Sequence, residues 1–454
     1  MSRFIITDRK TGYLLPPSVD DWLNQDHLAR FIVEVVDNLD LSNLVRQYAG
    51  RGSKAHHPAT LLAILVYGYA TGTFSSRKLE RATYDSVAFR YIAAGSHPDH
   101  DTLATFRRRF LGELESLFVQ VLEMAGEMKL LKLGTVCLDG TKIHANASRH
   151  SALSHGHIVK LEAQLKAEVQ ELLALAEQAD QADVPDGMSL PEELKRREDR
   201  LALMAAAKEK LAARAKERYG REKAEYDEKM SRRAAKEKAS GKKSGGKAPV
   251  APTAGLRDSD QINLTDEESR IMPVSGGGFE QAYNAQAGVD APTMLVVATG
   301  VTQATNDKQQ VAPMLATLAA QTVTQGKVTC LIADTGYFSE HNMKACEAAK
   351  TEALLAVGRE NHHPNWRERH TEPAPLPADA TPAQTMAHRL KTKSGRQRYA
   401  LRKQTVEPVF GIIKSVMGFR QFSLRGLDKV RGEWRLVCLA WNLKRMAVLR
   451  PKFG

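Results

Sequence analysis

The 454-residue sequence is poor in cysteine: it has only Cys137, Cys330, Cys346 and Cys438, which lie far apart. No two of them form a CxxC pair, and none combines with histidines at the spacing that zinc sites use. Neither a disulfide framework nor a zinc site is therefore indicated. We expect the four thiols to be buried in the core.

Long apolar runs are also missing. No stretch approaches the roughly 20 consecutive apolar residues that a membrane-spanning helix needs. The N-terminal residues MSRFIITDRKTGYLLPP lack the apolar block and small-residue cleavage site of a secretory signal. The sequence therefore predicts a cytoplasmic protein without a membrane partner. Its 43% of hydrophobic residues suffice for a core and exclude simple disorder.

Positive charge is abundant and unevenly distributed. The chain has a net charge of +12, and residues 389–452 alone carry 10 Arg and 7 Lys against Glu407, Asp428 and Glu433. A basic region of this density neutralises phosphates and releases counterions, which gives sequence-independent affinity for DNA. A solvated charged surface would have the same composition.

Residues 1–132 have a helical pattern. Segments 57–72, 75–93 and 100–110 carry apolar residues at three- and four-residue spacing, which predicts short helices joined by turns. The third segment holds Arg107 and Arg108 in a basic cluster. A helix-turn-helix DNA reader, with these arginines contacting DNA, and a small helical packing module both fit this N-terminal domain.

Residues 151–256 are predicted to be a helical insertion followed by a linker. The composition shifts to Ala, Glu, Lys, Arg and Leu, and Leu165 and Leu172 mark one face of a long helix. Pro185 and Pro191 interrupt this pattern and favour two helices over one. The Gly/Ser/Lys/Pro-rich end is typical of a flexible linker. A partner-binding arm, a DNA-contacting arm and a spacer all remain open as roles.

Strands and helices alternate after the linker. The patterns indicate a strand hairpin at 278–302, then a helix at 307–323, a strand at 328–334, a helix at 339–350, a strand at 351–358 and a final helix near 397–417. Together with an earlier strand that ends at Asp139, this order predicts an α/β fold, an RNase H-like mixed sheet flanked by helices. Residues 133–150 and 257–454 would form this domain, which ends in basic helices.

Two apolar strands end in aspartates, Asp139 in TVCLDG and Asp334 in TCLIADT. If these strands are parallel neighbours, their carboxyl ends coincide and the two carboxylates can share a metal ion. Glu407 is a lone acid among basic residues on the final helix. Mg²⁺ and Mn²⁺ prefer carboxylate oxygens, and two-metal phosphodiester chemistry uses such a set. Turn capping and an ordinary ion pair would explain each acid singly.

Three segments, LDGTKIHANAS, IADTGYFSE and RKQTVEPVFGIIK, resemble in order the catalytic motifs of DDE transposases from bacterial insertion sequences. The helical region from PSVDDWLNQDHLARF to TFRRRF also resembles the N-terminal domain of these proteins. The resemblance implies that Asp139, Asp334 and Glu407 are the catalytic, metal-binding triad. It also implies two Mg²⁺ ions, with Mn²⁺ as a substitute.

Many relatives carry a Tyr-x2-Arg-x3-Glu-x6-Lys signature around the glutamate. Tyr399, Glu407 and Lys414 fit this signature, but Arg402 lies one residue too far upstream of the glutamate. Lys403 has the expected spacing to the glutamate but not to the tyrosine. Lys414, Arg402, Lys403 and Tyr399 are therefore candidate DNA contacts, and the departure leaves open which basic residue reaches the strand.

The resemblance implies an enzyme that binds transposon ends, hydrolyses them to release a 3′-hydroxyl and transfers that end to target DNA. Synapsis of two ends implies a homodimer or a larger oligomer, and action on DNA implies association with the bacterial nucleoid. Two alternatives remain. One is a metal-dependent nuclease that cuts without joining, and the other is a non-catalytic DNA-binding protein.

Overall fold

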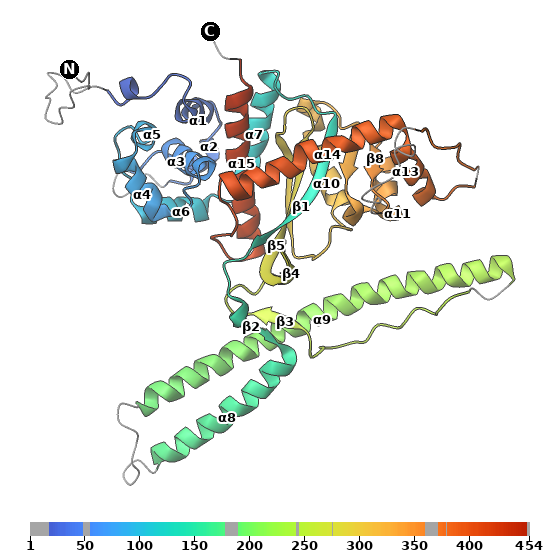
Figure 1. Ribbon diagram of the computed structural model, residues 1–454. Helices are drawn as coiled ribbons and strands as arrows, with labels where there is room; N and C mark the ends of the chain where they lie inside the picture. The colour runs from blue at the N-terminus through green and yellow to red at the C-terminus, as the bar shows by residue number, and fades with distance from the viewer. Residues whose placement is uncertain are drawn as a thin grey trace, which may run out of the picture. The chain divides into compact units, whose positions relative to one another are not determined.

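The computed structural model describes residues 18–48, 55–177, 189–241, 245–274, 276–358, 371–377 and 379–451 (Figure 1). It divides into two compact units, one made of Met1–Ala145 and Met272–Gly454, the other of Asn146–Ile271. No helix in the described ranges combines the length and apolar character that crossing a membrane requires.

A mixed β-sheet forms the centre of the first unit. Its strands are β1 (Thr135–His144), β4 (Arg270–Pro273), β5 (Phe279–Asp290), β6 (Val296–Thr302), β7 (Cys330–Ala333) and β8 (Glu352–Leu355). β1 pairs antiparallel with β5 and parallel with β7, and β8 extends the parallel side. β4 and β6 both pair with β5. Residues 136–138 of β1 and all four residues of β7 are apolar and fully buried, as strands covered on both faces require.

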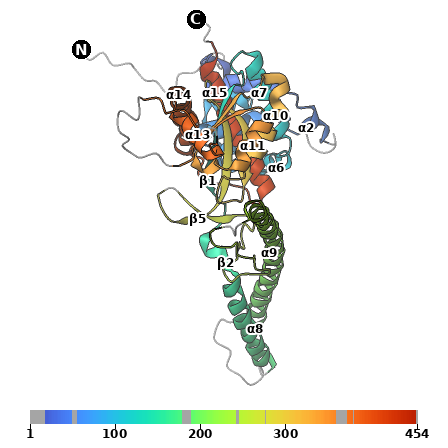
Figure 2. The ribbon, with the colours of Figure 1, turned by 90° about the vertical axis from the view of Figure 1, so that its right-hand side faces the viewer.

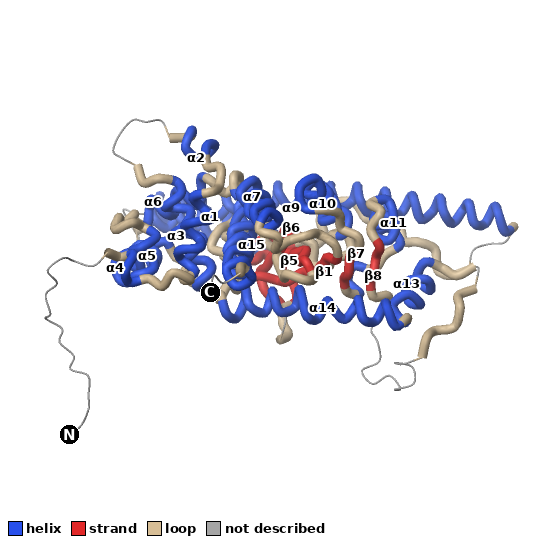
Figure 3. The backbone as a smooth tube through the Cα atoms, turned by 90° about the horizontal axis from the view of Figure 1, so that it is seen from above, coloured by secondary structure: helices blue, strands red, loops and turns tan. Residues whose placement is uncertain are grey.

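Helices cover both faces of this sheet. α14 (Lys393–Gly411) crosses one face, whereas α10 (Val311–Gln325) and α11 (Glu340–Ala348) lie on the other (Figure 3). α13 (Pro382–Lys391) precedes α14, and a π-helical segment, η4 (Ile412–Val416), follows it. The structure confirms the predicted RNase H-like arrangement of a mixed sheet with flanking helices.

The N-terminal part of the first unit is helical, as predicted. Its helices are α1 (Leu28–Asp37), α2 (Ser42–Arg46), α3 (Pro58–Thr71), α4 (Ser76–Asp85), α5 (Val87–Ile92), α6 (His100–Arg109) and α7 (Leu114–Glu127). α3 is buried on nearly all sides, which fits its almost uniformly apolar sequence. The C-terminal helix α15 (Leu427–Leu449) packs against α3, α7 and β6. Sequence patterns alone did not reveal that the chain end joins these helices to the sheet.

α15 also covers one edge of the sheet. The Asn442 side chain accepts a hydrogen bond from the Val296 backbone N–H and donates one to the Val296 carbonyl, both at 2.8 Å. These bonds satisfy backbone groups of an edge strand that would otherwise be open to pairing. All four cysteines are free and buried, which confirms the expectation from their spacing.

The second unit contains two long helices, α8 (His155–Glu177) and α9 (Leu190–Ser240), which pack side by side (Figure 2). Short strands β2 (Ala152–Ser154) and β3 (Gln261–Asn263) pair antiparallel beside them. A small core holds Leu165, Met204 and Leu211. Pro191 lies in the first turn of α9, where its missing N–H leaves no helical bond unmade. The prediction of two helices in this region is confirmed.

Candidate active site

Asp139 and Asp334 start from adjacent positions of the sheet. β1 and β7 are parallel neighbours, and their register pairs Leu138 with Ala333, so the two aspartates follow paired residues. This confirms the expected parallel pairing of the two strands. This pairing brings together two acids that are nearly 200 residues apart in sequence. Their separation in sequence is large because the helical unit Asn146–Ile271 is inserted between their strands.

Asp139 lies largely out of solvent, with its side chain 18% exposed. Its Oδ1 accepts a hydrogen bond from the Gly140 N–H at 2.8 Å, and its Oδ2 accepts one from Arg402 Nη1 at 3.1 Å. Burial raises the pKa of Asp139 to about 6, although the Arg402 guanidinium opposes this rise. The carboxyl group is therefore held in a setting that favours a nearby positive charge.

Asp334 directly follows β7 and begins the short 3-10 helix η3 (Thr335–Tyr337). Its Oδ1 accepts a hydrogen bond from the Gly336 N–H at 2.8 Å. Asp334 thus caps a turn, as the simpler interpretation of the sequence expected. Turn capping uses one carboxylate oxygen of Asp334. The charge of the Asp334 carboxylate also raises the pKa of neighbouring Asp139.

Arg402 links the third acid to the first. On α14 its Nη2 donates to Glu407 Oε1 at 2.8 Å, while its Nη1 donates to Asp139. Burial lowers the pKa of Arg402, but the surrounding carboxylates, including Asp334, outweigh this effect and the pKa is raised. Asp139, Asp334 and Glu407 therefore gather around one guanidinium from three separate elements.

The remaining residues of the predicted signature lie near this cluster. Lys414, in η4, donates from Nζ to the Lys142 carbonyl at 3.1 Å, and burial lowers the pKa of its ammonium. Tyr399 is half-buried and interacts electrostatically with Arg402. Lys403 is exposed on α14. The structure thus gives Arg402 and Lys414 fixed positions at the acids and leaves Lys403 facing solvent.

The two arginines of α6 differ in their surroundings. Arg107 Nη1 donates to Tyr69 Oη at 3.1 Å and to the Phe74 carbonyl at 2.9 Å. Tyr69 in turn donates to the buried Glu433 of α15, so Arg107 belongs to an internal network that ties α6 to α3 and α15. These bonds give Arg107 a structural role, and its contact with DNA stays a prediction. Arg108 is exposed and remains accessible.

Comparisons with known families match two segments of the chain. A profile described as "Transposase DDE domain" matches residues 365–447, and one described as "Transposase domain (DUF772)" matches residues 17–109. Both matched families are transposases, and the two matches together support a DDE transposase of the insertion-sequence type. Searches of curated proteins and of solved structures found no match. The DDE match to this transposase includes Arg402, Glu407 and Lys414, whereas Asp139 and Asp334 lie outside the matched residues.

DDE transposases cut DNA and transfer strands with divalent metal ions, so the acids can be tested against that requirement. Three carboxylates supply the hard oxygen ligands that such ions prefer. As they stand, no three His, Cys, Asp or Glu side chains in the described residues are grouped closely enough to hold an ion. The Arg402 guanidinium supplies the positive charge between Asp139 and Glu407 instead. The three carboxylates are therefore suitable ligands for a cation once the Arg402 guanidinium has moved away from Asp139 or Glu407.

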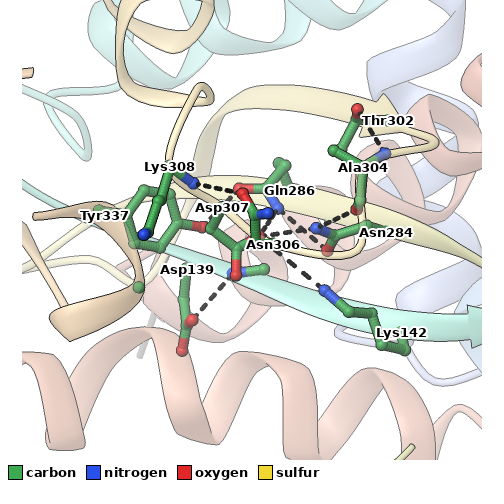
Figure 4. Close-up of polar contacts among 12 residues, drawn as sticks. Asp139, Lys142, Asn284, Gln286, Thr302, Ala304, Asn306, Asp307, Lys308 and Tyr337 are labelled. Atoms are coloured by element: carbon green, nitrogen blue, oxygen red, sulfur yellow. Dashed lines mark hydrogen bonds and ion pairs between the residues drawn. The ribbon is translucent and has the colours of Figure 1, made fainter. Parts of the chain in front are cut away.

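The sequence patterns did not predict the polar network around Asp307, because they place this residue at the start of a helix (Figure 4). Asp307 lies in the loop between β6 and α10, and its Oδ1 accepts hydrogen bonds from Asn284 Nδ2 at 2.7 Å and Gln286 Nε2 at 2.6 Å. Tyr337, three residues after Asp334, donates to Gln286. Polar residues at alternating positions of an otherwise buried strand, here Asn284 and Gln286, were the available signal.

Gly140 is required by this network. A Cβ atom there would lie 2.2 Å from Gln286 Nε2 and 2.6 Å from Asp307 Oδ1, so the side chains or the strand beside Asp139 would have to shift. We expect Gly140→Ala to slow DNA cleavage by roughly tenfold or more, since misplacing reacting groups by about 1 Å can lower rates up to ~10²-fold. Cleavage rates and circular-dichroism melting measure the effect.

The matched control for this prediction is Gly112→Ala, because a Cβ atom at Gly112 would meet nothing within 4 Å. A Gly140→Ala transposase that folds and cuts DNA at the normal rate would contradict the assignment of this crowded strand to the active site.

Proposed function

We propose that this transposase binds the ends of its own element, hydrolyses a phosphodiester bond there and joins the released 3′-hydroxyl to target DNA. Asp139, Asp334 and Glu407 are the catalytic acids. The observation that carries the proposal is the gathering of these three acids, from β1, the end of β7 and α14, around the Arg402 guanidinium.

Two divalent ions, Mg²⁺ or Mn²⁺, would supply positive charge that stabilises the attacking and leaving oxygens of the phosphodiester. The three acids would hold these ions. Asp139 is suited to this role because its buried carboxylate, with a pKa of about 6, is ionised at neutral pH but short of compensating charge. Arg402 supplies that charge in the absence of metal and would turn toward the DNA phosphates when the ions bind.

The DNA backbone would be held by basic residues next to the acids. Arg402 bonds Asp139, Lys414 bonds the Lys142 carbonyl on the same strand as Asp139, and Lys403 and Tyr399 lie on the same helix as Glu407. Lys and Arg are effective phosphate partners, the latter through its paired donors. Arg108 on the exposed side of α6 would add a contact from the helical N-terminal part.

The proposed functions of the domains follow the domain boundaries that the sequence predicts. Residues 1–132 would recognise the element's ends, residues 133–150 and 257–454 would carry the chemistry, and residues 151–256 would form the insertion. Since two ends must be brought together before joining, we propose that the active form is a homodimer or a larger assembly.

The decisive experiment uses duplexes made from the DNA that flanks the gene, incubated with the full chain and Mg²⁺ or Mn²⁺. The wild type is expected to release 3′-hydroxyl ends and to join them to a target plasmid only when a divalent ion is present. Asp139→Asn, Asp334→Asn and Glu407→Gln should lose both products while still binding DNA. Asp428→Asn, which changes a carboxylate that is 94% exposed on α15, is the matched control.

A second readout does not depend on activity. Binding of Mn²⁺, followed by electron paramagnetic resonance, should weaken in the three variants and stay unchanged in Asp428→Asn. Ends that are cut but never joined would favour the nuclease alternative. Cleavage that persists in all three variants would overturn the catalytic assignment, and DNA binding without any metal-dependent cleavage would favour a non-catalytic role.

A further inference from the structure

Lys142 lies on β1 three residues after Asp139, and its ammonium has donors to spare. In the part of the chain that the structure describes, its one ion pair runs from Nζ to Asp307 Oδ1 at 4.0 Å, which is too long for a hydrogen bond. Within the described residues no side chain or carbonyl accepts a hydrogen bond from this ammonium. The side chain is 17% exposed, so part of it reaches solvent.

Asp307 is held in place far more firmly than its surface loop would suggest. Asn284 and Gln286, both fully buried on β5, donate to the same carboxylate oxygen. Gln286 is fixed in turn by Tyr337 and by Asn284 Oδ1, and Asn284 also donates to the Ala304 carbonyl. This network makes Asp307 a rigid, negatively charged support on the Lys142 side of β1.

The strand register explains why these groups share a face. Gly140 pairs with Gln286 and Lys142 pairs with Asn284, so the alternation of β1 and β5 places them together beneath Asp307. The side chain of Asp139, which is one residue before Gly140, points away from Asn284, Gln286 and Asp307 (Figure 4). It bonds Arg402 on α14 instead. Lys142 therefore flanks the acids on the side opposite Arg402.

We propose that Lys142 is a DNA-contacting residue of this active site, and that Asp307 is a positioning residue that holds its ammonium toward a backbone phosphate next to Asp139. The inference rests on the proposed function, because a phosphate must lie beside the three acids if they are catalytic. A lysine side chain is long and flexible, so a fixed carboxylate at its end restricts the positions from which the ammonium can donate.

The test measures the affinity of the full chain for a fluorescent random-sequence 30-base-pair duplex over a series of salt concentrations, because backbone contacts do not depend on sequence. Lys142→Gln is expected to weaken binding about threefold to tenfold near 0.1 M salt and to reduce the salt dependence by about one counterion. Lys142→Arg, which keeps the charge, should restore most of the affinity. Lys344→Gln, an exposed lysine of α11, is the matched control and should change neither value.

Asp307→Asn tests the positioning role, since asparagine keeps the oxygen that accepts from Asn284 and Gln286 but loses the charge. It should weaken binding about twofold to threefold. In the double variant Lys142→Gln/Asp307→Asn the affinity should equal that of Lys142→Gln, because no ammonium is left to position. The melting temperature of each variant establishes that it is folded.

Three results would overturn the inference. One is an unchanged salt dependence in Lys142→Gln, and another is an additive loss in the double variant. The third is an Asp307→Asn chain that needs more Mn²⁺ for cleavage while Lys142→Gln does not, which would make Asp307 a metal ligand. None of these results bears on the triad, whose own failure would show as cleavage retained in Asp139→Asn.

Discussion

Asp139→Asn is expected to slow DNA cleavage by at least about 10³-fold and, in the absence of metal, to make the protein more stable at neutral pH. The rate loss follows because a carboxylate that holds a catalytic ion contributes several kcal/mol to transition-state stabilisation. Each ~1.4 kcal/mol corresponds to a factor of ten in rate. The gain in stability follows from the burial of the same group.

Burial raises the pKa of Asp139 from 3.8 to about 6, against the opposing effect of Arg402. A carboxyl group whose pKa is raised in the folded state destabilises the fold when it ionises. This penalty is complete above pH 6 and disappears as the pH falls toward 3.8. A shift of about two pKa units corresponds to about 3 kcal/mol, which is the largest gain that the neutral amide can bring at pH 7.5.

Urea unfolding of the metal-free protein in EDTA between pH 4 and pH 8 measures this gain. The advantage of Asp139→Asn should be largest above pH 7 and should shrink steadily below pH 6. Glu407→Gln is the matched control, because Glu407 is exposed and its replacement should abolish cleavage without adding stability. An advantage that stays constant over the whole pH range would mean that ionisation of Asp139 does not cause it.

The sequence carried enough information to predict the core of this site. Two apolar runs that each lead into an aspartate predicted parallel neighbours, and the register of β1 and β7 confirms that pairing. The prediction that the first strand ends at Asp139 was wrong, because β1 continues to His144 through its pairing with β5. Glu407 was predicted on a helix because of its regular surroundings, and α14 includes it. These features depend on local periodicity and on the known handedness and order of α/β units, both of which a single sequence records.

The parts that escaped prediction depend on contacts between distant segments. Arg402 was marked by its imperfect spacing, but only the structure shows its guanidinium between Asp139 and Glu407. The sequence around Asp307 is that of an ordinary loop, and only the structure shows that Asn284 and Gln286 of β5 bond its carboxylate. In the arginine run of α6, a rotation of about 100° per residue turns Arg107 inward to Tyr69 and leaves Arg108 exposed. Composition cannot distinguish two such neighbours.

Arg402→Ala is expected to destabilise the metal-free protein by about 3 kcal/mol, because removing one partner of a largely buried ion pair leaves the other charge uncompensated. The side chains of Arg402 and Asp139 are only 15% and 18% exposed, so water can compensate little of the loss. Arg402 lowers the pKa of Asp139, so its removal raises that pKa further. The loss of stability should therefore be greater at pH 8 than at pH 6.

Mn²⁺ should then stabilise Arg402→Ala more than it stabilises the wild type. A ligand that binds only the folded state adds about 2.7 kcal/mol at a concentration of 100 times its Kd, and the variant should have the lower Kd because no guanidinium competes for the carboxylates. The matched control is Arg398→Ala, which changes an arginine on the same helix as Arg402 and breaks its ion pair with Glu352 of β8. It should respond to Mn²⁺ as the wild type does. Equal Mn²⁺-induced shifts in melting temperature for Arg402→Ala and the wild type would show that the guanidinium does not occupy the place of the ion. A larger shift in the variant would mean that this arginine keeps the acids together until metal and DNA arrive.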